Sequence, residues 1–439
     1  MCTLNEDIFR QIVDYLSTEE LRSINRAHSV FYEAWMKSRY ASIRISKRDK
    51  ETKRLLGHLC QPYVARHVKR LELHPWLVQP RTKSPRSLTE NVIIRCMQLV
   101  DPDYTRKTAE QRLQKRLAKD TKRLTAAFTA MTELQEYSID WDESDRFHPE
   151  FYSALLVPPL ETWAQHLTTL TVRVPLSMIG SLARLRLTRL ESFTYHFCTG
   201  NTPLKDIHNA HDGFVVFVNN LKDTLQALSF LSTSTSQHLD LSRMFRTLGT
   251  FPSLKKVTLS LPFDGGQLSD PMSFVGFLTR HRGSLKDFRL LTSRCAVHAK
   301  PGDPEQINWI QRILKAINKP FPLLSGVGIA LRPLRAPLGT LVDFLDMHSS
   351  TIQSVSLMDR SLRMHEVVDL WPANASEGIL ELHVKVDALS AQLLERFARK
   401  FPNLKTLKLE CNRVSIDRSC AMDVNFRHKG VVSYIILML

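Results

Sequence analysis

The dominant pattern along the chain is a hydrophobic motif, L-x-x-L-x-L with aliphatic or aromatic substitutes, that recurs over most of its length. Its copies begin at Val68, Leu134, Leu167, Leu190, Leu225, Leu254, Leu285, Leu324, Ile352, Ile379 and Leu404. The alternation at the end of each copy predicts a short strand with one buried face. From Leu134 onward the copies start 23 to 39 residues apart, which leaves room for one helix between successive strands.

A second pattern shows that two kinds of repeat alternate. One kind has apolar residues at positions i and i+3 and a leucine or histidine at i+7. Its copies are Phe214/Phe217/Leu221, Phe274/Phe277/His281 and Leu341/Phe344/His348. The other kind ends a helix with Phe-Pro, at Phe251, Phe321 and Phe401. Proline stops a helix before the next strand begins. The matching positions of His281 and His348 indicate a structural role for both histidines.

This strand motif and its spacing resemble those of leucine-rich repeat proteins. The resemblance implies parallel strands that alternate with helices, an α/β solenoid in which each repeat packs on its neighbours. The spacing is irregular, and asparagine is missing from the usual turn position after the strand. We therefore expect an irregular leucine-rich-repeat-like array over residues 131–425, preceded at 46–130 by a basic first repeat and an insertion.

The first 45 residues carry a different, helical pattern. Leu4, Ile8, Ile12 and Leu16 recur at four-residue steps after the potential cap Asn5, which predicts one amphipathic helix. Ser17, with Glu20 three residues later, predicts a capping box and a second helix. Ser29 is a candidate cap for a third helix. Three short helices bury little apolar surface, so such a module usually needs a partner.

These helices resemble the F-box motif, with asparagine at position 5 where proline is usual. The resemblance implies that the chain binds the Skp adaptor, which joins a cullin and a RING subunit in an SCF-type ubiquitin ligase. The chain would then select a protein substrate and perform no chemistry. The positions that match the adaptor-binding residues of the motif are Leu4, Ile8, Ile12, Leu16, Leu21 and Phe31. Two alternatives stay open: a helical cap on the repeats, and a leucine-rich-repeat scaffold unrelated to ubiquitination.

The net charge of +16 is concentrated in one quarter of the chain. Residues 46–125 hold twenty basic and eight acidic residues, whereas residues 1–45 hold six of each. Within this segment, Leu113, Leu117, Leu124, Phe128 and Met131 predict the apolar face of a helix. A basic patch lies largely opposite: Arg112, Lys115, Arg116, Lys119, Lys122 and Arg123. The patch is either a solvated helix face or a dock for an acidic partner, an anion or nucleic acid.

Enzyme chemistry has no recognisable signature in this sequence. The chain has no P-loop, GxGxxG, GxSxG or HExxH motif, so we expect neither an enzyme nor a bound cofactor. His208, His211 and Asp212 are the nearest approach to a metal-binding cluster, and a polar loop is the preferred interpretation. Seven cysteines without a CxxC pair make disulfides or structural zinc unexpected, and Cys60 and Cys96 are interpreted as small buried residues.

The ends of the chain indicate where the protein resides. The first twenty residues mix acids and bases without the apolar core of a signal peptide. The apolar stretch at the C-terminus, within residues 426–439, has nine residues from Val431 to Leu439 and is too short to cross a bilayer. It is a terminal strand or a tail. We expect the protein in the cytoplasm, the nucleus or both, without a membrane partner.

Overall fold

The computed structural model describes residues 6–47, 49–74, 88–141, 149–199, 203–233, 236, 239–293, 307–334, 338–371, 376–414 and 433–438. Contacts between Cα atoms group the chain into two compact units. Unit 1 comprises Met1–Val174 and Arg184–Leu190, and unit 2 comprises Pro175–Ala183 and Glu191–Leu439.

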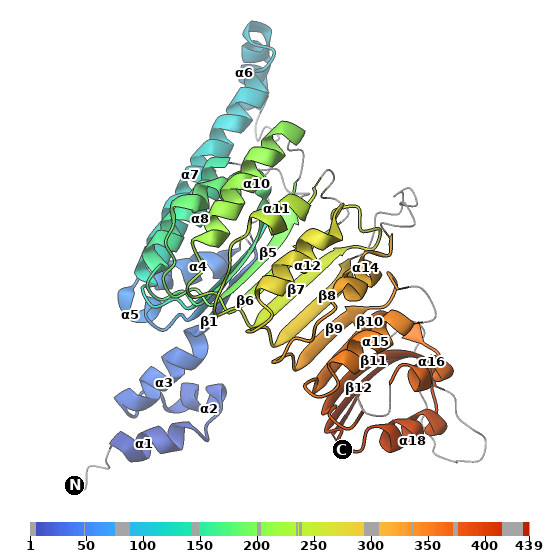
Figure 1. The fold of residues 1–439 in the computed structure, drawn as a ribbon. Helices are drawn as coiled ribbons and strands as arrows, with labels where there is room; N and C mark the ends of the chain where they lie inside the picture. The colour runs from blue at the N-terminus through green and yellow to red at the C-terminus, as the bar shows by residue number, and fades with distance from the viewer. Residues whose placement is uncertain are drawn as a thin grey trace. The chain divides into compact units, whose positions relative to one another are not determined.

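Unit 1 combines helices with a parallel sheet (Figure 1). Its helices are α1 (Glu6–Val13), α2 (Thr18–Ile24), α3 (Ser29–Tyr40), α4 (Lys50–Leu59), α5 (Pro62–Ala65), α6 (Leu88–Val100), α7 (Tyr104–Ala130) and α8 (Pro149–Trp163). Its strands are β1 (Ser42–Ile45), β2 (Arg70–Leu73), β3 (Glu136–Asp140) and β4 (Thr169–Pro175). The strands pair in chain order, with Ile43, Leu71, Tyr137 and Leu170 in register.

Unit 2 repeats one strand and one helix many times. Its strands are β5 (Ser192–Cys198), β6 (Ala227–Ser232), β7 (Lys256–Pro262), β8 (Asp287–Ser293), β9 (Gly326–Ala330), β10 (Ser354–Leu362), β11 (Glu381–Leu389), β12 (Thr406–Val414) and β13 (Ser433–Met438). Its helices are α9 (Leu176–Ile179), α10 (Leu204–Asn219), α11 (Ser242–Thr247), α12 (Pro271–Arg280), α14 (Trp309–Ala316), α15 (Gly339–Met347), α16 (Met364–Asp369) and α18 (Ala391–Lys400). A short 3-10 helix, η1 (Gly180–Arg184), follows α9.

The strands of unit 2 also pair in chain order. Strands β5 to β12 are parallel, and β13 pairs antiparallel with β12. Figure 1 shows the helices of unit 2 along one face of this sheet. The α/β repeat architecture expected from the sequence is therefore confirmed.

The predicted strands occur where the hydrophobic motif places them. Each of the eleven motif copies is followed, two residues after its first position, by the start of a strand, from β2 to β12. The first motif position is a buried residue just before the strand, as Leu225 and Leu254 illustrate at 0% exposure. Strand β1 was missed because Ile43 and Ile45 give only two alternating apolar positions. The C-terminal stretch, left open between strand and tail, contains β13.

One backbone contact recurs from repeat to repeat and sets the register. The carbonyl oxygen of Lys255 accepts hydrogen bonds from the amides of Lys286 and Asp287, at 2.7 and 2.9 Å. The carbonyl of Lys286 accepts in the same way from Ser325 and Gly326, both at 2.9 Å. The same pair of hydrogen bonds to one carbonyl oxygen recurs at later repeats. Each strand therefore begins in the same register relative to the preceding strand.

Aromatic side chains form a connected series of contacts in the core of unit 2 from β6 to β8. Phe245 lies between Phe230, with ring centroids 6.0 Å apart, and Phe274, with centroids 4.6 Å apart. Phe274 in turn contacts Phe288 at 6.4 Å. Phe245 and Phe274 are 0% exposed. Burial of such rings stabilises each repeat against its neighbours.

His281 and His348 connect neighbouring repeats in the same way. The Nε2 atom of His281 accepts from the backbone amide of Phe251 at 2.9 Å, and that of His348 accepts from Phe321 at 3.0 Å. The opposite ring nitrogen, Nδ1, lies 2.8 Å from the carbonyl oxygen four residues earlier in both histidines. An Nε2 acceptor requires the neutral ring with its proton on Nδ1. Burial lowers the pKa of both histidines, and the structural role predicted for them agrees with these contacts.

An aspartate with a left-handed backbone joins three repeats near the end of β10. Asp359 has φ of 70°, a conformation that disfavours a side chain other than glycine, asparagine or aspartate. Its carboxylate accepts from the amides of Leu331 and Arg332 at 2.7 and 3.0 Å, and from the hydroxyl of Thr292 at 2.6 Å. These three hydrogen bonds offset the backbone strain.

Candidate interaction surfaces

The three N-terminal helices have a small core of their own. Leu21 and Phe31 are buried, at 4% and 7% exposure. The ring of Phe9 stacks on His28 with centroids 4.3 Å apart and meets Phe31 edge-on at 5.4 Å. The capping box predicted at the start of α2 is present, since the Ser17 hydroxyl accepts from the Glu20 amide at 3.3 Å and the Glu20 carboxylate accepts from the Ser17 amide at 2.7 Å.

Two local predictions for these helices are wrong. The cap of α3 is His28, whose Nδ1 accepts from the Val30 amide at 3.2 Å, and Ser29 is the first residue of the helix. Stacking on Phe9 holds the ring of His28 in place at this cap position. Helix α1 ends at Val13, so Leu16 lies in the following loop and does not extend the helical stripe. The expected cap Asn5 lies outside the described residues.

Helix α1 leaves its apolar residues largely in solvent. None of its residues is buried. Ile8 is 42% exposed, Ile12 is 40% exposed, and Tyr15, just after the helix, is 89% exposed. We call these three residues the α1 surface. Exposed aliphatic and aromatic groups gathered on one short helix are typical of a docking surface.

The predicted adaptor-binding residues therefore divide into two sets. Ile8 and Ile12 face solvent, whereas Leu21 and Phe31 pack inside the module. Leu16 is half-buried, and Leu4 lies outside the described residues. A buried residue acts on a partner only by holding the exposed ones in place. The adaptor-binding role of all six stays a prediction.

Helix α7 presents the predicted basic patch. Leu113, Leu124 and Phe128 are buried, at 8%, 0% and 1% exposure, on the face that packs against α4, α5 and α8. Five of the six basic side chains are exposed, and Arg116 is half-buried. Within the part of the chain that the structure describes, none of these six side chains forms an ion pair with a carboxylate. The patch is thus unneutralised by carboxylates of the described residues.

The face of the unit 2 sheet opposite the helices is a third surface, which we call the open sheet face. Among the described residues of unit 2, no helix covers this face (Figure 1). Strand registers place one residue from each strand in its central row. The row reads Thr194, Ser229, Thr258, Arg289, Gly328, Ser356, His383 and Lys408. Sequence analysis did not single out these residues, although they occupy the polar position between the last two apolar positions of each motif.

Charges on the open sheet face pair both across neighbouring strands and along one strand. Asp287 lies 3.3 Å from Lys256 and 3.0 Å from Arg289. The side chain of Arg289 lies against Gly328, where an added Cβ would come within 3.0 Å of its Cγ. Glycine at position 328 therefore lets the guanidinium stem lie flat on the neighbouring strand. Farther along, His383 lies 3.5 Å from Glu410, and burial lowers the pKa of this histidine.

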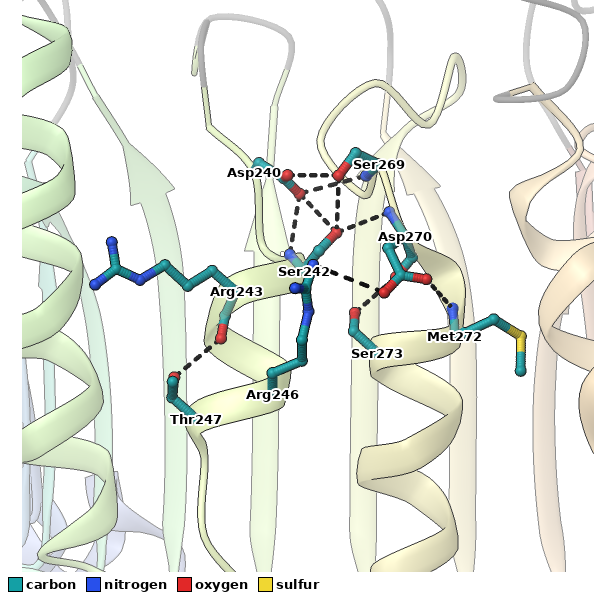
Figure 2. Close-up of polar contacts among 9 residues, drawn as sticks. All are labelled: Asp240, Ser242, Arg243, Arg246, Thr247, Ser269, Asp270, Met272 and Ser273. Carbon is teal, nitrogen blue, oxygen red and sulfur yellow. Dashed lines mark hydrogen bonds and ion pairs between the residues drawn. The ribbon is translucent and has the colours of Figure 1, made fainter.

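A polar network ties the loops before α11 and α12 (Figure 2). The carboxylate of Asp240 accepts from the amide and hydroxyl of Ser242 at 3.0 and 2.7 Å, and from the hydroxyl of Ser269 at 2.5 Å. The Ser242 hydroxyl accepts from the Asp270 amide at 2.9 Å. Burial alone would raise the pKa of Asp240, but these donated hydrogen bonds hold it below its ordinary value. The network fixes two neighbouring helix starts.

The candidate metal ligands lie on a helix and not in the polar loop that the sequence suggested. His208, His211 and Asp212 belong to α10. His208 points to solvent, whereas His211 is buried, and burial lowers its pKa to about 4. Asp212 pairs instead with Arg243 at 2.9 Å. Among the described residues, no group of three or more His, Cys, Asp or Glu side chains could hold a metal ion.

Two further sequence-based points concern cysteines and membranes. Cys60 and Cys96 are both exposed, so the interpretation of them as buried residues is wrong. Cys60 caps the end of α4, and Cys96 lies on an outward face of α6. In the described part of the chain, no helix has the length and apolarity needed to cross a membrane.

Comparison with known proteins finds a likeness to a solved leucine-rich repeat structure. No protein-family model and no curated protein matches the chain. Among solved structures, the leucine-rich repeat-containing protein LegL7 from Legionella pneumophila is similar at 12% sequence identity. The match covers 66% of this chain and 87% of that one, with a TM-score of 0.40. The assignment to leucine-rich-repeat-like α/β folds accordingly rests on this chain's own strand register and helix alternation.

Proposed function

We propose that this protein is the substrate-recognition subunit of an SCF-type ubiquitin ligase. In this proposal the N-terminal helices bind the Skp adaptor, and through it cullin and RING subunits, while the repeats bind a protein substrate. The observation that carries the proposal is the α1 surface. Ile8, Ile12 and Tyr15 are exposed on a module whose resemblance to the F-box motif predicts an apolar contact there.

The module has a physical reason to bind a partner. Its own core consists of a few residues around Leu21, Phe31 and Phe9. Transfer of exposed aliphatic and aromatic groups from water into an interface is favourable by about 25 cal/mol per Å² of apolar area. A partner that covers the α1 surface would gain this free energy and would also complete the core. Charged groups would contribute little, because the acids and bases of α1 form ion pairs that are largely exposed to solvent.

The repeats supply the other half of the proposed function. An array with one uncovered sheet face is an architecture that binds proteins along its length. The central row of the open sheet face combines small residues, such as Ser229 and Ser356, with charged ones, such as Arg289 and Lys408. Small residues allow the backbone of a bound segment to approach closely, and the charges select its sequence. A substrate held on rigid repeats has a raised effective concentration near the transfer site.

Co-expression of the full chain with the Skp adaptor tests the adaptor contact. We expect a stoichiometric complex in affinity purification and size-exclusion chromatography. The double substitution Ile8→Asp and Ile12→Asp should abolish it, because two carboxylates would have to lose water in an apolar interface. Since both positions are exposed, the variant should remain folded by circular dichroism. Leu16→Asp should weaken the complex as well.

Met272→Asp with Leu323→Asp is the matched control. These positions are 52% and 48% exposed, so they change the same kind of residue at similar exposure in unit 2. The control should bind the adaptor as the unsubstituted chain does. A folded, soluble chain that binds no adaptor would contradict the proposal and leave a leucine-rich-repeat scaffold unrelated to ubiquitination. A cytoplasmic or nuclear location is part of the same proposal.

A further inference from the structure

Helices α6 and α7 form a hairpin whose first helix carries a second exposed apolar surface. The hairpin turn is closed by a hydrogen bond from Gln98 to Thr105 at 2.6 Å and by an ion pair between Lys107 and Asp101 at 2.7 Å. Five apolar residues of α6 are 42% to 86% exposed. They are Val92, Ile93, Met97, Leu99 and Val100, which we call the α6 surface. Their exposure on one 13-residue helix leaves a continuous apolar strip in water.

The second helix of the hairpin carries the basic patch as a straight line of charge. Its residues follow Arg112 at steps of +3, +4, +7, +10 and +11, which places all six along one flank of α7. At a rise of 1.5 Å per residue, the line is about 17 Å long. Like charges three and four residues apart repel one another and destabilise a helix. Repulsion along this unneutralised line lowers the stability of the unbound chain. A partner with negative charge would relieve the repulsion.

The two surfaces are adjacent along the hairpin. Because α6 and α7 run in opposite directions from the turn at 101–103, Val92 lies at the level of Arg112. The α6 surface therefore extends from the turn to the level where the basic line begins. The basic line then continues along α7 to Arg123. Together they span about 30 Å, the length of a helix of about 20 residues.

We infer that the α6–α7 hairpin binds a helical segment of a partner protein that carries carboxylates in one half and aliphatic side chains in the other. The inference rests on the proposed function in that this partner would be the substrate. Carboxylates would pair with the basic line, and the aliphatic half would cover the α6 surface. A partner helix that lies along the hairpin can place its acidic half on the basic line and its aliphatic half on the α6 surface at the same time.

Two other anionic partners fit the hairpin less well. Nucleic acid would pair with the basic line, but it would leave the aliphatic α6 surface uncovered, and no aromatic ring is interleaved with these bases for stacking. An anionic membrane would take up Leu99 and Val100 at the turn. Asp101 and Asp103 lie at that same turn in ion pairs with Lys107 and Arg106, at 2.7 and 3.1 Å, and insertion of the turn into lipid would have to remove these charges from water.

Fluorescence anisotropy with synthetic probes tests the inference on the full chain. The probe is a labelled helical peptide of about 20 residues, with glutamates in one half and leucines in the other. A second peptide has every glutamate replaced by glutamine. A duplex DNA of similar length and vesicles of phosphatidylcholine with phosphatidylserine are the other probes. We expect the acidic peptide to bind, with an affinity that falls as NaCl rises from about 50 to about 300 mM, and the glutamine peptide to bind at least about tenfold more weakly.

Substitutions locate the contact. Lys115→Glu, Lys119→Glu and Lys122→Glu together should weaken binding of the acidic peptide at least about tenfold. Met97→Gln with Leu99→Gln should weaken it about threefold to tenfold. The matched control is Lys222→Glu, Lys315→Glu and Lys319→Glu, which changes net charge equally at exposed positions of unit 2. The control should change the affinity less than about twofold.

Each remaining outcome overturns the inference in a recognisable way. Equal losses in the α7 triple variant and its control would show attraction to net charge alone. Binding of duplex DNA or vesicles in preference to the peptide would assign the hairpin to that partner instead. Adaptor binding is measured on the same variants and should be unchanged. If the unsubstituted chain binds the adaptor but not the acidic peptide, this inference alone is contradicted, whereas peptide binding without adaptor binding contradicts the proposed function alone.

Discussion

The helices of unit 2 bury large apolar residues, whereas the first N-terminal helix leaves its apolar residues exposed. In unit 2, Phe214, Phe245 and Phe274 are each 0% exposed. In the N-terminal module, Ile8 and Ile12 remain about as exposed as they are buried, and Tyr15 is almost fully solvated. Both regions consist of short amphipathic helices, so composition does not explain the difference.

The difference follows from what each helix has beside it. A helix of unit 2 packs on its own strand and on the helices of adjacent repeats, as α11 does with α12. Helix α1 contacts α3, and no strand of the described residues packs closely beneath it. A repeat is thus completed within the chain, whereas under the proposed function the module is completed by another protein. Exposed apolar groups on a helix with few neighbours indicate binding, and buried ones in a repeat indicate stability.

The comparison is sharpened most by removing one large side chain from each region. Phe245→Ala should lower the free energy of unfolding of unit 2 by about 3–5 kcal/mol, because it opens a cavity in the aromatic core. Tyr15→Ala should change the free energy of unfolding of unit 1 by less than about 0.5 kcal/mol, because the ring is already in solvent. Urea denaturation followed by circular dichroism measures both. Similar losses for the two variants would refute the assignment of separate roles.

The histidines that join repeats give a pH-dependent effect of intermediate size. Replacing His281 and His348 by leucine should cost about 1–3 kcal/mol each at neutral pH, because the amides of Phe251 and Phe321 lose their acceptors. Burial lowers the pKa of both histidines, so the folded state requires neutral rings. Their contribution is present above about pH 6.5, the unfolded pKa, and is lost as the pH falls below it.

Urea denaturation at about pH 7.5 and pH 5.5 isolates this contribution. The unsubstituted chain should lose more stability on acidification than the double variant does. His208→Leu is the control, since His208 is exposed on α10 and has no such hydrogen bond. If the double variant and the original chain responded equally to pH, the proposed link between the histidines and the repeats would be wrong.

The smallest expected effect concerns the open sheet face. Arg289→Ala removes a partly exposed ion pair with Asp287 and should change the free energy of unfolding by about 0.5 kcal/mol or less. If this face binds a substrate, the same substitution should weaken that binding far more than it affects stability. A large loss of stability would instead show that Arg289 stabilises the repeats as a core residue does, and the distinction between surface and core would be wrong at this position.

The repeat architecture was predictable because its signal is hydrophobic and periodic. Buried positions such as Leu254 and Leu259 recur with every strand, and the strand starts follow from them. Strand β1 and the cap at His28 were not predictable, since each depends on a few local contacts. The stacking of His28 on Phe9 is a tertiary contact that no spacing reveals.

The candidate surfaces were less predictable than the fold. The sequence identified the apolar residues of the N-terminal module, but not which of them lie inside, because Ile8 and Phe31 are both apolar and the spacing within each helix does not tell a core face from a binding face. It identified the basic line on α7, but not the exposed α6 surface beside it. The left-handed Asp359 is likewise invisible in sequence, because its hydrogen bonds come from residues 27 to 67 positions away.

Isothermal titration calorimetry of the full chain with the Skp adaptor, at several temperatures, tests the central claim most directly. We expect one adaptor per chain and a negative heat-capacity change, because the α1 surface would be removed from water. The Ile8→Asp and Ile12→Asp variant should give no binding heat, and the Met272→Asp and Leu323→Asp variant should titrate as the original chain does. A folded chain that gives no binding heat at any temperature and forms no complex would contradict the account.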